Sequence, residues 1–254
     1  MALKIIGSRA VGTFALLMIL ITMVGCSSGR SASSAPASPT APEVETVSGM
    51  PSGRIQLPGG IECRVRDREV HVPGFIAIDA GWIEQVACLR GTREHESIVV
   101  VDCQPSLVHS ALLMIGLESG APGRWLETMR GDRYVIERIP PTGSSVRVRV
   151  RFKDRNGNEI ESTVEELITR STEQEDLPST PWIFAGSRFD SKERYVADFS
   201  GSLIGFATFG DEVLGLPGVI SDQVSVDAAV WEIRTERVPS PGTPVTIVLS
   251  PWEP

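Results

Sequence analysis

GTREHESIVVVDCQPSLVHSALLMIGL, residues 91–117, is the stretch that decides the fold. Ser97–Val101 is rich in β-branched residues, which is typical of a strand buried on both faces. Pro105 stands where a helix can begin without losing a hydrogen bond, and Gly116 stands where that helix would end. Five apolar residues fall on one arc of this helix: Leu107, Val108, Ala111, Leu112 and Ile115. The stretch therefore predicts a polar loop, a buried strand and an amphipathic helix in direct succession.

The first residues of the chain resemble a bacterial lipoprotein signal. Lys4 and Arg9 form a short basic region, and residues 11–24 are an apolar run too short to span a bilayer comfortably. By this resemblance the chain is cut before Cys26, whose thiol carries a diacylglycerol. The usual pattern has a branched aliphatic residue where Met23 stands, and an uncleaved membrane anchor is the alternative. Both interpretations place the protein outside the cytoplasm, lipid-anchored or tethered to a bacterial membrane on its periplasmic or outer face.

Composition divides the chain into three parts. Residues 1–25 are the expected signal peptide, and residues 26–53 are rich in Ser, Ala and Pro with almost no large apolar groups. Such a segment cannot bury enough surface to offset its ordering entropy, so we expect a disordered tether behind the lipidated cysteine. The remaining residues 54–254 are enough for one β-rich domain or for two lobes, 54–150 and 151–254.

Charge and cysteine content argue against several classes of function. The formal charge is −8, and removal of residues 1–25 with their two basic side chains leaves −10, which argues against nucleic acid as a partner. Three further cysteines, Cys63, Cys88 and Cys103, permit one disulfide and one free thiol, although a core of this size does not need the bridge. The chain has no C-x-x-C pair, so we predict no cofactor.

Short alternating segments dominate the rest of the chain. Strands are predicted over 61–65, 69–78, 82–89, 146–152, 181–187, 194–199, 202–209 and 243–249. Asn156-Gly157 is a strong hairpin signal, and residues 162–166 can cap a short helix. Apolar strand contexts predict that Trp82, Trp182 and Trp231 pack in the core. We predict a β-rich α+β fold with a mainly antiparallel or mixed sheet and a few short helices.

An internal match supports the option of two duplicated lobes. Residues 137–146 align with residues 236–245 at an offset of 99, and the same offset places Gly116-Leu117 on Gly215-Leu216. Two separate matches at one offset indicate an ancient duplication. Coincidence between linkers rich in Pro and Gly is the alternative.

Residues spread over most of the domain carry a family resemblance. They are Cys88, Gly91–Ser97, Pro105, His109–Leu113, Gly116-Leu117, Pro140–Gly143, Pro181–Ser187 and Gly242–Val245. With this pattern the chain resembles the YdjY-type domain of bacterial secreted proteins over most of residues 60–250. The resemblance implies family membership but no particular reaction or ligand. The name-giving relative is described as ferredoxin-like, which does not transfer because this chain lacks the cysteine runs that a cluster needs.

The candidate binding or catalytic residues are His95, Glu96, Ser97 and His109. Fully extended, residues 95–103 would place their ends about 26 Å apart, so the histidines meet only if the polar loop curls back. A joint site would be a histidine oriented by a carboxylate, or a two-histidine metal centre. The alternative is a polar loop whose side chains satisfy backbone groups. Neither H-E-x-x-H nor G-x-S-x-G is present here, so we assign no metal ligand.

We predict a membrane-anchored extracytoplasmic lipoprotein that binds a small ligand or an envelope protein partner without catalysis. The alternative is a hydrolase that uses His95, Glu96 and His109, with or without a metal. Histidines that converge in one cleft would favour the hydrolase. Separate histidines that bond to loop backbone would favour the binding protein.

Overall fold

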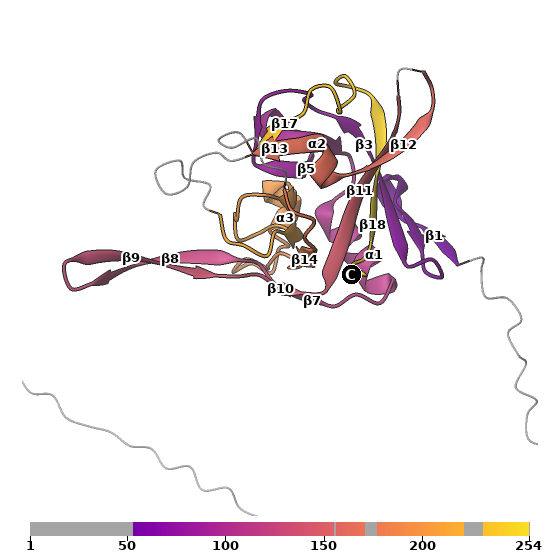
Figure 1. Cartoon of the computed structure of the whole chain (residues 1–254). Helices are drawn as coiled ribbons and strands as arrows, with labels where there is room; N and C mark the ends of the chain where they lie inside the picture. The colour runs from indigo at the N-terminus through magenta and orange to yellow at the C-terminus, as the bar shows by residue number, and fades with distance from the viewer. Residues whose placement is uncertain (1–52, 155, 171–176, 221–230, 254) are drawn as a thin grey trace, which may run out of the picture. The chain divides into compact units, whose positions relative to one another are not determined.

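The computed structural model describes residues 53–154, 156–170, 177–220 and 231–253 (Figure 1). All of these residues belong to one compact unit, residues 47–254. The predicted signal peptide, Cys26 and almost all of the predicted tether lie outside the described residues and stay predictions.

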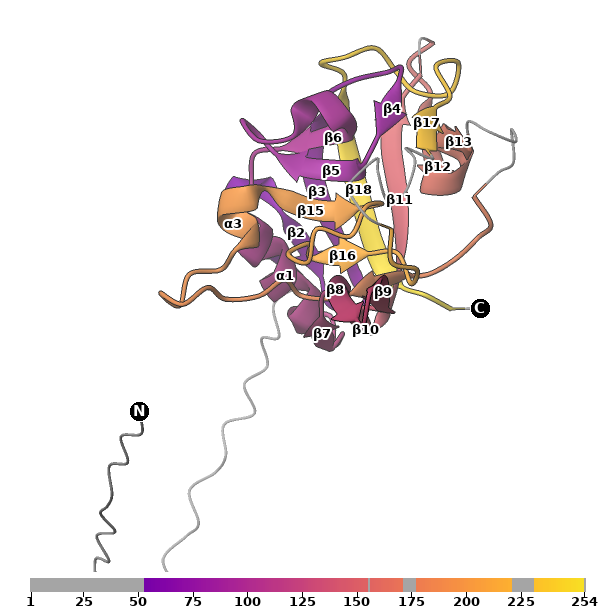
Figure 2. The same ribbon diagram turned by 90° about the vertical axis from the view of Figure 1, so that its left-hand side faces the viewer.

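Eight strands close into a barrel. In barrel order they are β3 (Glu69–Ile76), β18 (Pro244–Pro251), β11 (Ser145–Lys153), β14 (Trp182–Phe184), β16 (Leu214–Gly215), β15 (Ser202–Gly205), β5 (Gln85–Leu89) and β6 (Ser97–Val101). The β5–β6 and β15–β16 pairs are parallel, and the other barrel neighbours are antiparallel. Figure 2 shows β15, β16 and β5 in front of β18 and β11, which belong to the opposite wall.

The predicted α+β fold is wrong, because the strands form a closed barrel instead of a sheet covered by helices. The β-rich character is confirmed. Closure depends on β3, which pairs with β18 along one edge while Gly74–Ile76 pair with β6 along the other. A closed ring leaves its strands without exposed edges, so helices are not needed to cover them. Alternation along the sequence predicts strands, but it does not predict that β3 and β6 pair and so close the sheet into a barrel.

The two-lobe option of the fold prediction is also wrong. Strand β18 of the second half lies between β3 of the first half and β11, which crosses the boundary at residue 150, so the two halves share one barrel. The matched segments at residues 137–146 and 236–245 do have related positions, since each leads into one of the adjacent strands β11 and β18. The second match is not equivalent in structure, because Gly116 follows a helix and Gly215 lies in β16.

Alternate residues of the long strands fill the barrel. Val148 of β11 is opposite Leu249 of β18, and Leu249 is opposite Val70 of β3. Directly opposite residues share a face, so these three buried side chains lie on the same side of the sheet. Arg149 and Arg151 alternate with the valines and reach the other face, where both bond to Glu161 at 2.6 Å.

The predicted helix is confirmed as α1 (Pro105–Met114), directly after β6. Val108, Ala111 and Leu112 on this helix are fully buried in the core. The end of the helix is fixed from outside, because Arg68 Nε donates to the carbonyl of Ile115 at 3.2 Å.

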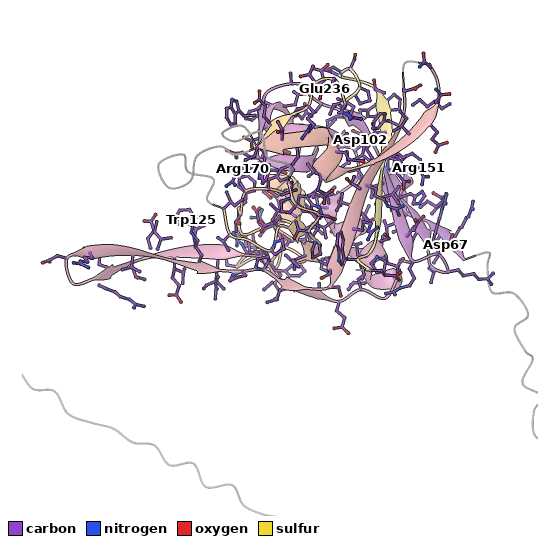
Figure 3. All side chains as sticks on the ribbon, viewed as in Figure 1. Asp67, Asp102, Trp125, Arg151, Arg170 and Glu236 are labelled. Carbon is purple, nitrogen blue, oxygen red and sulfur yellow. The ribbon has the colours of Figure 1, made fainter. Side chains whose placement is uncertain are left out.

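Strands β8 (Arg124–Arg130) and β9 (Arg133–Ile139) form a hairpin that the sequence analysis missed. They pair with each other and with no other described strand. Figure 1 shows this hairpin extending away from the barrel, and Figure 3 shows Trp125 on it.

The other described elements are short. They are β1 (Arg54–Gln56), η1 (Pro58–Gly60), β2 (Glu62–Arg64), β4 (Trp82–Ile83), η2 (Glu94–Glu96), β7 (Ser119–Ala121), β10 (Thr142–Gly143), β12 (Glu159–Thr163), α2 (Val164–Leu167), β13 (Ile168–Arg170), α3 (Ala197–Ser200) and β17 (Trp231–Ile233). Helix α2 begins with the predicted cap, since Thr163 and Glu166 form a capping box. The strand predicted over 194–199 is wrong, because the second half of that segment belongs to α3. Trp182 and Trp231 are buried as predicted, but Trp82 is 51% exposed.

Candidate functional site

The polar loop before β6 holds the first three candidate residues. His95 Nε2 lies 3.6 Å from Glu96 Oε2, and the His95 side chain is 78% exposed. Glu96 also pairs with Arg93 at 3.4 Å, and the Arg93 guanidinium lies over the ring of Phe209 at 3.9 Å. Ser97 is fully buried, and its hydroxyl donates to the Arg93 carbonyl at 2.8 Å. Ser97 therefore stabilises the loop backbone and is not exposed to a substrate.

His109 lies on α1 and contacts a different part of the chain. Its Nδ1 is 2.9 Å from the Tyr195 hydroxyl and 3.2 Å from the Gly186 carbonyl oxygen. The Tyr195 hydroxyl donates to the same carbonyl at 3.0 Å. A carbonyl only accepts, so these contacts assign the proton to Nδ1 and leave Nε2 as an acceptor. Burial lowers the pKa of His109 against the opposing effect of the Gly186 carbonyl, so the ring is neutral at pH 7.

The structure brings His95 and Glu96 together but does not bring His109 to them. The partners of His95 lie within the loop before β6, whereas those of His109 lie in residues 184–195. No group of three or more His, Cys, Asp or Glu side chains suited to a metal ion occurs in the described part of the chain. The described contacts therefore form two separate polar sites and not the joint site, which was one of the two options left open by the sequence, and the His109 site includes a bond to loop backbone.

The three described cysteines are free and buried. Burial raises the pKa of the Cys103 thiol to about 11 and also raises that of Cys63 and Cys88. A thiol with such a pKa is protonated at neutral pH, and the thiolate is the nucleophilic form. These cysteines are therefore structural.

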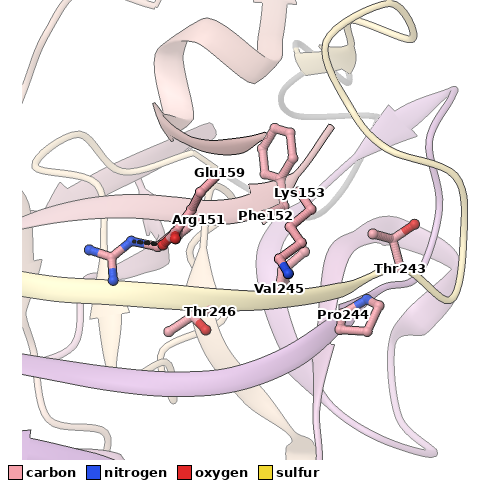
Figure 4. Close-up of a pocket in the computed structure, with 8 residues that line it drawn as sticks. All are labelled: Arg151, Phe152, Lys153, Glu159, Thr243, Pro244, Val245 and Thr246. Atoms are coloured by element: carbon pink, nitrogen blue, oxygen red, sulfur yellow. Dashed lines mark ion pairs between the residues drawn. The ribbon is translucent and has the colours of Figure 1, made fainter. Parts of the chain in front are cut away.

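Two adjoining hollows lie where β11 passes the start of β18, and together we call them the barrel-end groove. The larger hollow has a volume of about 910 Å³ and the smaller about 400 Å³. Phe152, Lys153 and Thr243 line both. The larger is also lined by Asp154, Asn156, Ile160, Ser162 and Thr235–Ser240. Figure 4 shows the smaller, which adds Arg151, Glu159 and Pro244–Thr246.

Local contacts fix the two walls of the barrel-end groove. On one side, the Asp154 carboxylate accepts the backbone N–H groups of Asn156 and Asn158, each at 2.8 Å, and so holds the β11–β12 turn. On the other side, the Thr243 hydroxyl donates to the Ser240 carbonyl at 2.7 Å and holds the loop before β18. A site between two fixed turns is largely formed before a ligand arrives.

The lining of the groove combines apolar surface with neutral hydrogen-bonding groups and with charged side chains of both signs. Phe152 and Ile160 are opposite each other in the β11–β12 pair, so they present one apolar face. Hydroxyl and amide side chains surround them: Asn156, Ser162, Thr235, Ser240 and Thr243. Among the cations of the lining, Arg151 is neutralised by Glu159 at 3.4 Å, as Figure 4 shows, whereas Lys153 has no ion pair among the described residues. Strand β12 pairs only with β11 in the described structure, so its outer edge is unpaired.

The sequence analysis missed this groove. Its walls are two segments about eighty residues apart, 151–162 and 235–246, which meet because β11 and β18 pair. The Asn156-Gly157 signal predicted one wall correctly as a turn. The other wall is the loop before β18. The sequence signal nearest to it was the match between residues 137–146 and 236–245, which aligned the segments that precede β11 and β18.

Comparison with known families gives a match over most of the chain. Residues 62–250 match the YdjY domain. The chain belongs to the YdjY domain family. The YdjY domain of this chain runs from the first residue of β2 to the last residue but one of β18, so it contains the barrel, the barrel-end groove and both histidine sites.

No curated protein and no solved structure matches this YdjY domain protein. No helix in the described ranges is long and apolar enough to cross a membrane.

Proposed function

We propose that this YdjY domain protein is a non-catalytic binding protein of the bacterial envelope, held to the membrane by a lipid on Cys26. Its barrel-end groove takes an extended peptide segment of an envelope partner. The observation that carries the proposal is the groove itself, which lies between two locally bonded turns and has a lining of apolar, neutral polar and charged groups. Pockets of this kind bind by apolar burial and gain specificity from a few polar contacts.

An extended peptide fits the groove better than a compact ligand. Ile160 and Ser162 of β12 both line it, and they are two residues apart on one face of the strand. The outer edge of β12 offers unpaired backbone groups, and addition of a strand to such an edge is a common mode of peptide recognition. Alternate side chains of the peptide would then lie along the apolar floor.

The arrangement of the histidines favours binding over hydrolysis. A hydrolase that uses His95, Glu96 and His109 needs these groups around one substrate, but among the described residues the two histidines share no hydrogen-bond, ion-pair or ring partner. Hydrolysis therefore stays the alternative. If the purified protein cleaves a substrate, the hydrolase hypothesis expects a His109→Ala variant to lose that activity.

Filling the groove tests the binding proposal. Ser240 is exposed on the groove wall, so Ser240→Trp places an indole in the peptide's path. We expect peptides with alternating apolar and polar residues to shift the NMR signals of residues 152–162 and 235–243 in the ¹⁵N-labelled wild type. Ser240→Trp should lose these shifts, whereas Ser191→Trp, on an exposed turn outside the groove, should keep them. A peptide set that shifts no groove residue in the wild type contradicts the proposal.

A second experiment tests the anchor. We expect mass spectrometry of the membrane fraction to find the mature chain beginning at Cys26 with a diacylglycerol on its thiol. Cys26→Ser should leave the signal peptide attached and the chain without lipid, because the thiol is the site of modification. An unmodified Cys26 in the wild-type protein would overturn the lipoprotein assignment.

A further inference from the structure

Both outer edges of the β8–β9 hairpin lack a strand partner in the described structure. Among the described strands β8 and β9 pair only with each other, along seven residue pairs from Arg124–Ile139 to Arg130–Arg133. An isolated two-stranded hairpin is marginally stable in water. This hairpin also exposes large apolar side chains: Leu126 is 42% exposed, Met129 61% and Ile136 37%. A free edge next to exposed apolar residues is a template for pairing with another strand.

The charges of the hairpin differ from those of the rest of the chain. Residues 124–139 hold four arginines and three carboxylates, whereas the whole chain has a formal charge of −8. Arg130 and Arg133 stand directly opposite each other at the tip, and neither has an ion pair among the described residues. Like charges in opposite positions destabilise a strand pair, so a carboxylate from another chain beside Arg130 or Arg133 would reduce this repulsion.

We propose that β9 pairs with β9 of a second copy of this chain, antiparallel and centred on Val135. The two hairpins then form one four-stranded sheet about a two-fold axis. In this register residue i of one copy is opposite residue 270 − i of the other. Arg133 is therefore opposite Glu137 of the second copy, and by symmetry Glu137 is opposite its Arg133. Val135 packs against itself on the axis.

The backbone of β9 fits this register. Gly131 has φ +65° and Asp132 has no positive φ, as expected for a two-residue type II′ turn that closes on the Arg130–Arg133 pair. The Thr128 hydroxyl reaches the Val135 carbonyl at 3.4 Å, so that carbonyl points toward β8. Backbone direction alternates along a strand, so residues 134 and 136 direct their N–H and C=O groups to the free edge. The proposed register places residue 134 opposite residue 136 of the second copy, so the backbone N–H and C=O groups at the free edges of the two strands face each other.

The other free edge does not fit a second copy in the same way. A two-fold pairing of β8 centred on its middle residue would place Glu127 opposite Glu127 and Arg124 opposite Arg130. In a register that places Glu127 opposite Arg130, the numbers of opposite residues add up to an odd value. Residues whose backbone N–H and C=O groups point to the free edge would then lie opposite residues whose groups point back to β9. Neither of these two β8 registers combines opposite charges with matching backbone direction, as the β9 register does, so we place the pairing on β9.

Cysteine cross-linking tests the register in the full-length protein purified in detergent. Residues in the middle of a non-hydrogen-bonded antiparallel pair have Cα atoms about 4.5 Å apart, within the range of a disulfide. We expect Val135→Cys to give a covalent dimer on mild oxidation. Thr128→Cys is the matched control, because it is the direct partner of Val135 in the hairpin but lies on β8, roughly three strand spacings from its symmetry mate. Equal cross-linking of both variants, or none with Val135→Cys, would overturn the proposal.

Charge reversal tests the ion pairs. Arg133→Glu and Glu137→Arg each place like charges opposite each other twice in the dimer, so we expect each to weaken dimerisation about tenfold in sedimentation equilibrium. The double variant restores opposite charges and should return to within about twofold of wild type. A double variant as weak as the single ones contradicts the register. If the wild type is monomeric and binds vesicles of anionic lipid, and Arg133→Glu loses that binding, the hairpin contacts a membrane surface and the proposed dimer is wrong.

Discussion

At the scale of single residues, Glu212 is an acidic group in a buried environment. Its side chain is buried, and an added Cβ at Gly215 would lie 3.2 Å from one of its carboxylate oxygens. The other oxygen accepts the backbone N–H of Asp211 at 3.1 Å. Burial raises the pKa of Glu212 to about 7, backbone hydrogen bonds oppose that rise, and the neighbouring Asp211 carboxylate adds to it. The glycine on β16 gives the carboxyl group its space.

This environment predicts how stability depends on pH. The pKa of Glu212 in the folded protein lies above the ordinary value of 4.5, so the stability that its protonation contributes is fully present below pH 4.5 and is lost as the pH rises through 7. The cost of ionisation above pH 7 is roughly 3 kcal/mol. We expect Glu212→Gln to be more stable than wild type at pH 8 and equal to it at pH 4.5 in guanidinium unfolding. A wild-type to variant difference that is the same at both pH values contradicts this assignment.

At the scale of elements, the sequence correctly predicted the helices, strands and turns that are specified by residues close together in the chain. The buried strand β6 and the helix α1 follow from the β-branched run and the proline that starts the helix, and both lie where residues 91–117 placed them. The capping box of α2 and the turn after β11 are equally local. Each of these features depends on residues within a few positions of one another, so neighbouring residues alone specify it.

Elements whose partners are distant in sequence were predicted less well. The strand expected at 194–199 forms α3 and a single bridge, because Tyr195 is fixed by Gly186 and by His109 on α1. The β8–β9 hairpin was missed although Gly131-Asp132 is a known two-residue turn signal, since its strands do not alternate cleanly between apolar and polar residues. Of the candidate site, the sequence identified His95 next to Glu96 but could not place His109, whose partners lie about eighty residues away.

At the scale of the whole molecule, the order of strands in the barrel determines both how the barrel closes and where the groove lies. Strand β18 forms the longest run of barrel pairs, with β11 on one side and β3 on the other. The same arrangement builds the barrel-end groove, because the loop before β18 meets the turn after β11 only when these strands are paired. Binding in the groove and closure of the barrel therefore depend on the same contacts.

Interleaving of the two halves predicts a single unfolding transition. A cut at residue 150 divides β11 and separates β18 from β3, so neither fragment holds the strands that close the barrel. We expect far-UV circular dichroism and tryptophan fluorescence of residues 47–254 to change together in guanidinium, because Trp182 and Trp231 are buried in the common core. The fragments 54–150 and 151–254 should each be unfolded under conditions where the intact unit is folded. Separate transitions for the two probes, or a dispersed NMR spectrum from either fragment alone, would show that the halves fold independently.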